Sequence, residues 1–378
     1  MRCDSLQICL PVTPAGHRHR RKSSTEGHKY MTIIANQYDW VVGVDTHAQT
    51  HTFTLLNCRT GEATDTRQFP TTIAGMKRAL NWIHRNTSGH TVFAAIEGTS
   101  SYGSRLTQLF IESGIAVGEV RPPSKSSRTM TGKSDPIDAE AAARSITGRD
   151  AAHIPTPRAA GIRHALQILL AARSLIDQQR TANKNALTAL LRVIDLDIDA
   201  RKPLTDKQLA TIGAWRISTA DQAIGIARTE AKRLANSVTD STQQLDKNRI
   251  QLQNLSEQIA PEFQKIPGVG PVTAAIIICA YSHPGRVRSE AAFAALGGVA
   301  PRPASSGNTT RHRLNRSGDR QLNRAFDIIA RTRMSYDPTT REYVTTRRAA
   351  GKTNREIRRC LKRYICRQIF HQINTIMS

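Results

Sequence analysis

The sequence predicts a mixed α/β domain, then long helices, then a basic and mostly helical C-terminal region. Three observations support this order. Short apolar strand patterns alternate with helical ones as far as residue 150. From about 158 to 260, long polar-apolar runs contain little Gly or Pro. The net charge of +24 is concentrated toward the C-terminus, where residues 301–378 carry 18 Lys/Arg against 5 Asp/Glu.

The first region contains five strand patterns. DWVVGVDTH (39–47), TVFAAIEGTS (91–100) and IAVGEVRPP (115–123) are apolar runs that end in polar or turn residues, whereas HTFTLLN (51–57) alternates and TRQFP (66–70) is short. Paired strands followed by strands that alternate with helices are typical of a mixed sheet in a domain of roughly 100 residues.

Two helices are expected between these strands. TTIAGMKRALNWIHRN (71–86) has helical spacing that places Ile73, Met76, Leu80 and Ile83 on one side. SYGSRLTQLFIESG (101–114) follows and is stopped by Gly114. Both helices are expected to pack against the sheet.

Four acidic residues lie where elements of this domain begin or end. Asp45 and Glu97 each end a strand, and Asp135 and Asp138 open the alanine-rich helix in TGKSDPIDAEAAA (131–143). In local terms Asp135 is an N-cap, with Pro136 at the first helical position. The three-residue spacing also lets both carboxylates face one ion. Because carboxylates at neighbouring strand ends meet in one crevice, the four together favour a site for Mg²⁺ or Mn²⁺.

The second half is predicted to be helical. Residues 165–195 and 219–259 keep apolar stripes typical of an antiparallel pair or a coiled coil. IPGVGP (266–271) opens the last domain, and the hairpin amides of Gly268 and Gly270 either form a turn or bind phosphate in a helix–hairpin–helix. The helix over 353–373 has one apolar face among arginines, which suits packing and phosphate contact equally.

Charge and composition narrow the class of partner. Residues 31–150 carry 12 Lys/Arg and 11 Asp/Glu, so the basic surface lies behind a nearly neutral first domain. A pI near 10.6 indicates that the binding partner is a polyanion, most simply nucleic acid. No apolar run reaches the roughly 18 residues of a membrane span, and six cysteines without CxxC spacing suit a reducing cytoplasm.

The motifs VGVDTH, AAIEGTSSYG and KSDPIDA resemble the Asp-Glu-Asp-Asp signature of a RuvC-like (RNase H-like) catalytic domain. IPGVGP and GGVAPRPASSGNTTRHRLNRSGDRQLNRA resemble the C-terminal domain of the same transposases. Together, over about residues 39–350, they resemble the insertion-sequence-110 family of DEDD transposases. Lys133-Ser134-Asp135 replaces the family's usual Lys-Thr-Asp and keeps the acid.

The resemblance implies a recombinase that excises and inserts its mobile element. Asp45, Glu97, Asp135 and Asp138 would be its metal ligands. The nucleophilic serine falls on Ser305 or Ser306, which the loop alone would assign to a turn. Arg311, Arg313 and Arg316 could hold a phosphate nearby. The implied partners are element and target DNA, a structured guide RNA, and further copies of the chain in a dimer or tetramer, acting at the bacterial nucleoid.

The expected organisation has four parts. They are a disordered basic extension (1–30), a RuvC-like catalytic domain (31–155), a helical or coiled-coil arm (156–260) and a basic C-terminal transposase domain (261–378). Two alternatives are a RuvC-like junction-resolving nuclease that does not join strands and a non-catalytic helix–hairpin–helix DNA-binding protein. Strand joining separates the first alternative from a recombinase, and metal dependence separates the second.

Overall fold

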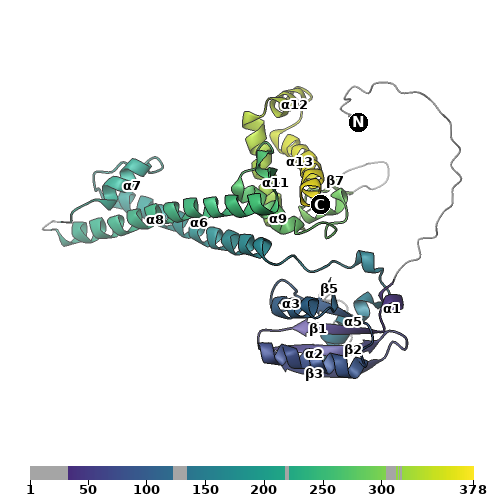
Figure 1. Cartoon of the computed structure of the whole chain (residues 1–378). Coiled ribbons are helices and arrows are strands. Elements are labelled where there is room, and N and C mark those ends of the chain that lie inside the picture. The colour runs from purple at the N-terminus through teal and green to yellow at the C-terminus, as the bar shows by residue number, and fades with distance from the viewer. Residues whose placement is uncertain (1–32, 122–133, 218–220, 304–311, 314, 316) are drawn as a thin grey trace, which may run out of the picture.

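A computed structural model describes residues 33–121, 134–217, 221–303, 312–313, 315 and 317–378. The extension predicted over residues 1–30 lies outside these residues. The described chain forms an N-terminal sheet domain, a long helical arm and a helical C-terminal domain (Figure 1). The predicted order of a mixed α/β domain followed by a mostly helical region is confirmed.

The sheet domain is built from five strands and their helices. Its elements are α1 (Ile34–Gln37), β1 (Trp40–Thr46), β2 (Thr50–Asn57), β3 (Ala63–Pro70), α2 (Ile73–Thr87), β4 (Val92–Glu97), α3 (Ser104–Glu112), β5 (Ala116–Val120) and α5 (Asp135–Thr147). The strand order is β3-β2-β1-β4-β5, with β1, β2 and β3 antiparallel and with β4 and β5 parallel to β1. This order puts β1 at the centre, with a parallel neighbour on one side only.

Helices cover both faces of the sheet. Val42 and Val44 of β1 pack with the buried residues of α2 and α3, whereas Val41 packs with Ala143 and Ile146 of α5. Alternation of side chains along β1 produces these two cores. Gly43 and Asp45 lie on the same side of β1 as Val41, and they therefore face α5.

Two details of this domain differ from the prediction. The third strand was predicted over 66–70 but begins at Ala63, because it pairs with β2 along an exposed edge that carries no apolar signal. In α2, Met76 and Ile83 are buried as expected, but Ile73 is 57% exposed. The helix turns Ile73 away from the sheet at its first residue.

Gly43 lets α5 lie directly on β1. A Cβ atom at Gly43 would be 2.0 Å from the Ala139 carbonyl oxygen and 2.7 Å from the Ala143 nitrogen. Both are backbone atoms, which cannot rotate away. The close approach therefore sets the position of α5 relative to the end of β1.

Gly43→Ala should destabilise this domain by about 3 kcal/mol, the upper range for overpacking a core. Gly148→Ala is the matched control, because a Cβ at Gly148 meets nothing within 4 Å. Urea unfolding followed by tryptophan fluorescence measures the difference, since Trp40 and Trp82 lie in the sheet domain. Equal unfolding midpoints for the two variants would contradict the role given to Gly43.

The arm and the C-terminal domain are helical apart from one short ladder. Their elements are η1 (Ala151–His153), α6 (Ile162–Val193), α7 (Asp206–Gly213), α8 (Gln222–Ile259), η2 (Phe263–Lys265), α9 (Pro271–Tyr281), α10 (Glu290–Leu296), β6 (Arg302–Pro303), β7 (His312–Arg313), α11 (Arg320–Tyr336), α12 (Pro338–Ala349) and α13 (Asn354–Met377). α6 and α8 lie side by side along the arm (Figure 1). They run antiparallel, because Arg173 donates to the Leu245 carbonyl at 2.9 Å while Asn248 donates to the Leu169 carbonyl at 3.0 Å.

The C-terminal domain packs around α9, in which residues 273–281 are all buried. The terminal helix α13 buries the predicted apolar face of Ile357, Leu361, Ile365 and Ile369. Some of its cations pair within the domain, as when Arg358 Nε lies 3.3 Å from an Asp327 carboxylate oxygen. Others, such as Arg359, are exposed. Within the described residues, no helix has the length and apolarity needed to cross a membrane.

Candidate active site

The carboxyl ends of β1 and β4 bring two of the predicted acids together. The parallel register pairs Val44 with Ile96, so Asp45 and Glu97 are neighbours one residue further along their strands. Asp45 is 7% exposed. Glu97 is half-buried, and its carbonyl accepts a hydrogen bond from Thr46 Oγ1 at 2.9 Å. The edge of a sheet where parallel strands end is a common place for ligands.

Helix α5 brings the other two acids to the same region of the domain. Asp135 is the first helical residue and Asp138 lies one turn further, where it is 8% exposed. Ser134 occupies the N-cap and makes no side-chain cap bond, so the local alternative in which Asp135 caps the helix is wrong. Asp135 Oδ2 instead accepts from Gln68 Nε2 of β3 at 3.4 Å.

Asp45, His47 and Asp135 form a compact group. Their potential ligand atoms all lie within 4.8 Å of one another, and no other such group of three occurs among the described residues. His47 Nδ1 lies 3.5 Å from Asp45 Oδ2 and 3.9 Å from Asp135 Oδ2. Two carboxylates and an imidazole make a donor set that fits a divalent cation. Glu97 and Asp138 lie outside this group.

His47 was not predicted as part of the site. It follows Asp45 by two residues in VGVDTH, and a single His-Asp pair has no recognisable ligand spacing. His51, the nearby alternative, is buried in β2 and packs edge-on against Phe53. Both side chains lie on the face of the sheet opposite to Asp45. Burial lowers the pKa of His51. Of these two histidines, only His47 reaches the carboxylates.

The predicted phosphate hairpin connects η2 to α9. Gly268 has a φ of +80°, and the Gly270 amide donates to Thr273 Oγ1 at 2.9 Å. The Gly270 amide is therefore already used within the hairpin. The hairpin lines a cleft of about 800 Å³ that also contains three cations, Arg173, Lys265 and Arg324.

The predicted serines, Ser305 and Ser306, lie outside the described residues, as do Arg311 and Arg316. Arg313 is exposed in β7. The chain on either side of the serines is paired, with Arg302 opposite Arg313 in the β6–β7 ladder. The two ends of the serine segment are thus held next to each other.

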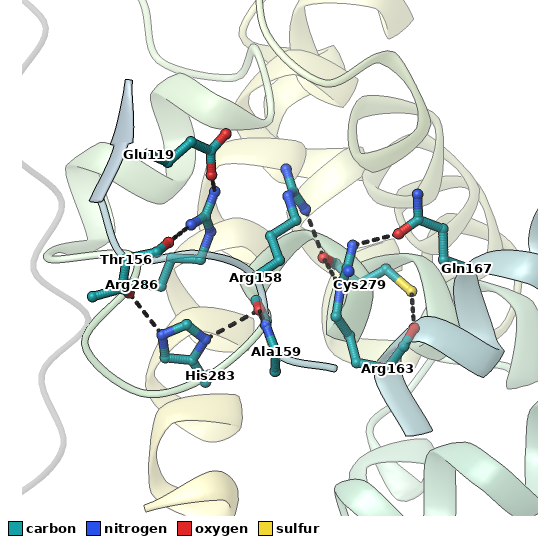
Figure 2. A network of polar contacts seen from close by, with 10 residues as sticks. Glu119, Thr156, Arg158, Ala159, Arg163, Gln167, Cys279, His283 and Arg286 are labelled. Carbon is teal, nitrogen blue, oxygen red and sulfur yellow. Dashed lines mark hydrogen bonds and ion pairs between the residues drawn. The ribbon is translucent and has the colours of Figure 1, made fainter. Parts of the chain in front are cut away.

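A polar network joins the sheet domain to the C-terminal domain (Figure 2). Arg286, which follows α9, donates from Nη2 to Glu119 Oε2 of β5 at 2.7 Å. It also donates from Nη1 to the Thr156 carbonyl of the linker. His283 adds a hydrogen bond between its Nε2 and Thr156 Oγ1 at 2.9 Å.

The linker is bonded to α9 through a second group of contacts in the same network. Arg158 Nη1 and Arg163 Nε donate to the Cys279 carbonyl at 2.8 and 3.3 Å. The Ala159 amide donates to Ser282 Oγ at 2.9 Å. Figure 2 shows that Arg158 and Arg163 converge on Cys279 from the linker and the start of α6. The network therefore holds β5 and the linker against the end of α9.

Arg286→Glu should loosen this junction by about 2 to 3 kcal/mol, because it places two carboxylates together where a partly buried ion pair stood. Arg288→Glu, an exposed site two residues away, is the matched control. The rate of trypsin cleavage at Arg158 in the linker reports the change. The double variant Glu119→Arg/Arg286→Glu should partly restore protection, and a failure to do so would argue against the pair.

Comparison with known proteins gives two family matches and one relative. A model of DEDD transposases of the IS110 type matches residues 42–195, and a model described as the transposase IS116/IS110/IS902 family matches residues 260–345. The "Insertion element IS110 uncharacterized 43.6 kDa protein" of Streptomyces coelicolor is 34% identical over 124 residues. That match spans 32% of this chain and 31% of the relative.

The mixed sheet, its acidic edge and the helical region behind it are those of a DEDD transposase with an RNase H-like N-terminal domain. The chain belongs to the IS110 family of transposases.

Proposed function

We propose that this chain is a DNA recombinase that excises and inserts its own insertion sequence by cutting and rejoining DNA. The proposal is supported most by the grouping of Asp45, His47 and Asp135 at the carboxyl edge of the sheet. The family match over residues 42–195 covers this edge.

In this proposal Asp45, Glu97, Asp135 and Asp138 hold Mg²⁺ or Mn²⁺. A divalent ion bound there would stabilise charge on the attacking and leaving oxygens of a phosphodiester. The chain's own contribution is to hold the carboxylates in place. Gly43 allows the close approach of α5, and Gln68 fixes the Asp135 carboxylate from β3.

His47 either ligates the ion or orients the two carboxylates beside it. His47→Ala should raise the Mn²⁺ concentration needed for half-saturation by about 10- to 100-fold, the usual effect of losing such a group. Titration of bound Mn²⁺ by electron paramagnetic resonance measures this without any nucleic acid. His84→Ala, at an exposed position of α2, is the control. Unchanged Mn²⁺ affinity in His47→Ala would remove His47 from the site.

The partners in the proposal are element and target DNA, with a structured RNA as guide, at the nucleoid. The net charge of +24 supports a polyanionic partner, and the guide rests on the family resemblance. A helix–hairpin–helix at Gly268 and Gly270 is one proposed phosphate contact. Assembly through a coiled-coil arm is supported by exposed apolar side chains on α6 and α8, such as Leu175 at 69% and Ile226 at 63%.

The test supplies the purified chain with donor and target plasmids and with RNA transcribed from the end of its own element. Products are sequenced across the new junctions, with Mg²⁺, with Mn²⁺ and with a chelator. Joined strands that depend on the metal support the recombinase. Cleavage without joining would identify a junction-resolving nuclease, and binding without cleavage would identify a DNA-binding protein.

A further inference from the structure

A cleft of about 750 Å³ lies between the sheet domain and the start of the arm. One wall is formed by α2, by α3 and by the loop that follows β4. The other wall is the linker and the first turns of α6. The loop wall begins with Thr99 and Ser100, directly beyond Glu97 and Gly98. The cleft therefore reaches the edge of the sheet where Asp45 and Glu97 lie, from the face that α2 and α3 cover, opposite α5.

The charge of the cleft is strongly one-sided. Its lining includes the cations Lys77, Arg105, Arg158 and Arg163, together with His164, against Glu112 as its acid. Neither Lys77 nor Arg105 forms an ion pair with another described residue, and both are exposed. Arg158 and Arg163 are held in place by the Cys279 carbonyl, so the far wall is fixed by the interdomain network (Figure 2). Lys77 and Arg105 on one wall and the half-buried Arg158 on the other suit an anion that passes between them, whereas Arg163 is buried and helps to hold the far wall in place.

The rim of the cleft is apolar. Ile73 is 57% exposed and Ile111 is 50% exposed, and both line the cleft. At the floor, the Thr99 and Thr107 hydroxyls have no hydrogen-bond partner among the described residues, although each residue is only 5% exposed. Buried hydroxyls nearly always have a partner, so the floor is incomplete without a ligand or water.

We infer that this cleft binds a single-stranded segment of nucleic acid and leads it to the acidic edge. Lys77, Arg105 and Arg158 contact its phosphates, and Ile73 and Ile111 offer apolar surface to unpaired base faces, which a duplex would keep hidden in its stack. A protein partner would be expected to bring acidic side chains, but it would not explain why the cleft adjoins the acidic group. The inference rests on the proposed function in one respect, that the chain acts on nucleic acid.

The test measures binding of labelled oligonucleotides to the full chain by fluorescence anisotropy, in a chelator so that nothing is cut. Single-stranded DNA, RNA of the same sequence and duplex DNA are compared over a range of salt concentrations. Lys77→Gln/Arg105→Gln should weaken single-strand binding at least about tenfold at physiological salt. It should also lower the slope of log affinity against log salt by about 1.4, since each phosphate contact contributes about 0.7.

Two further variants separate the parts of the cleft. Ile73→Ser/Ile111→Ser should weaken single-strand binding by about tenfold, the lower range for one stacked base, and leave the salt slope unchanged. Arg78→Gln/Arg85→Gln makes the same charge change as the cation variant on the same domain but outside the cleft, and should change affinity less than the cleft variants do. Tighter binding of DNA assigns the cleft to a substrate strand, and tighter binding of RNA assigns it to a guide.

Three outcomes would overturn the inference. They are equal losses in the Arg78/Arg85 control, preferential loss of duplex binding, and isoleucine variants that change the oligomeric state while leaving affinity unchanged. The proposed function is tested separately, because Asp45→Asn should stop cleavage and leave this binding intact. If the chain neither cuts nor joins DNA but the cleft variants lose single-strand binding, the proposed function is contradicted and the role of the cleft in binding is retained. A chain that binds no oligonucleotide at all would contradict both.

Discussion

Asp45→Asn should lower the rate of DNA strand cleavage at least about a thousandfold, since a bound divalent ion supplies several kcal/mol of transition-state stabilisation. Asparagine keeps the shape of the side chain but removes its charge, so the fold should change little. Glu97→Gln, Asp135→Asn and Asp138→Asn are expected to behave in the same way. Cleavage of labelled DNA under single-turnover conditions measures the loss, and circular dichroism checks the fold.

Glu140→Gln is the matched control for the acids. Glu140 lies on α5 as Asp135 does, but it pairs with Arg144 at the surface, at 2.6 Å. It should retain full activity, because an exposed pair of this kind contributes less than about 1 kcal/mol to stability. If instead Asp135 and Asp138 act only as helix-terminal charges, their substitution would cost about 1 kcal/mol of stability and leave cleavage intact. That result would remove α5 from the site.

The sheet domain was predictable because its strands are short apolar runs with clear ends. β1 and β4 are buried on both faces, so their hydrophobic patterns stand out from the polar segments around them. β3 was only partly found, since an edge strand with exposed Thr, Arg and Gln has no such pattern. The sequence also predicted both long helices of the arm but not the short α7, whose eight residues carry little periodic signal.

Of the group that the structure brings together, the sequence predicted Asp45 and Asp135 as site residues but not His47. Asp45 and Glu97 lie at strand ends, which the local sequence reveals. The parallel register of β1 and β4 places these two strand ends side by side. His47 enters the group only because the chain turns back into β2 immediately after β1, where the His47 amide donates to the Thr50 carbonyl at 3.2 Å. No spacing rule describes that geometry. The start of α5 was placed one residue too late, because Ser134, Asp135 and Pro136 suit several registers of a helix start.

The interdomain network could not have been predicted from local patterns. Arg286 and Glu119 are separated by 167 positions, and neither belongs to a motif. Their contact depends on how the linker carries the sheet domain back to α9. The same is true of the cleft beside it, whose two walls come from different parts of the chain. Long-range polar contacts of this kind are decided by tertiary packing.

The segment that contains Ser305 and Ser306 has a fixed base even though its own residues are not described. The β6–β7 ladder joins its two ends, and the chain after it is anchored where the Asp319 amide donates to the Leu296 carbonyl at 2.6 Å. Gly318 makes this possible, since its φ is +105° and a Cβ there would be 2.4 Å from the same carbonyl.

A covalent adduct between DNA and one of the two serines is the expected intermediate of the proposed reaction. Serine Oγ bonds to phosphorus as the phosphorus–oxygen bond to the departing strand end breaks, and the serine proton passes to a base. A serine hydroxyl is a weak nucleophile at neutral pH, so it needs an activating group. We expect the acidic edge of the sheet domain, from the same or another copy of the chain, to complete the site around the same phosphodiester.

Ser305→Ala and Ser306→Ala, tested separately, should identify the attacking residue, because only one of them should abolish the adduct on denaturing gels. Mass spectrometry of the trapped product would locate the bond. Ser317→Ala is the matched control, since Ser317 lies just beyond the ladder and bonds to Asn315 at 2.6 Å. Asp45→Asn should abolish the adduct as completely as the serine variant does, since both groups are proposed to act on one phosphodiester. An adduct that survives Asp45→Asn would show that attack by the serine does not require the acidic edge. Strand joining that survives Ser305→Ala/Ser306→Ala would exclude a serine nucleophile here and leave water or a 3′-hydroxyl as the attacker.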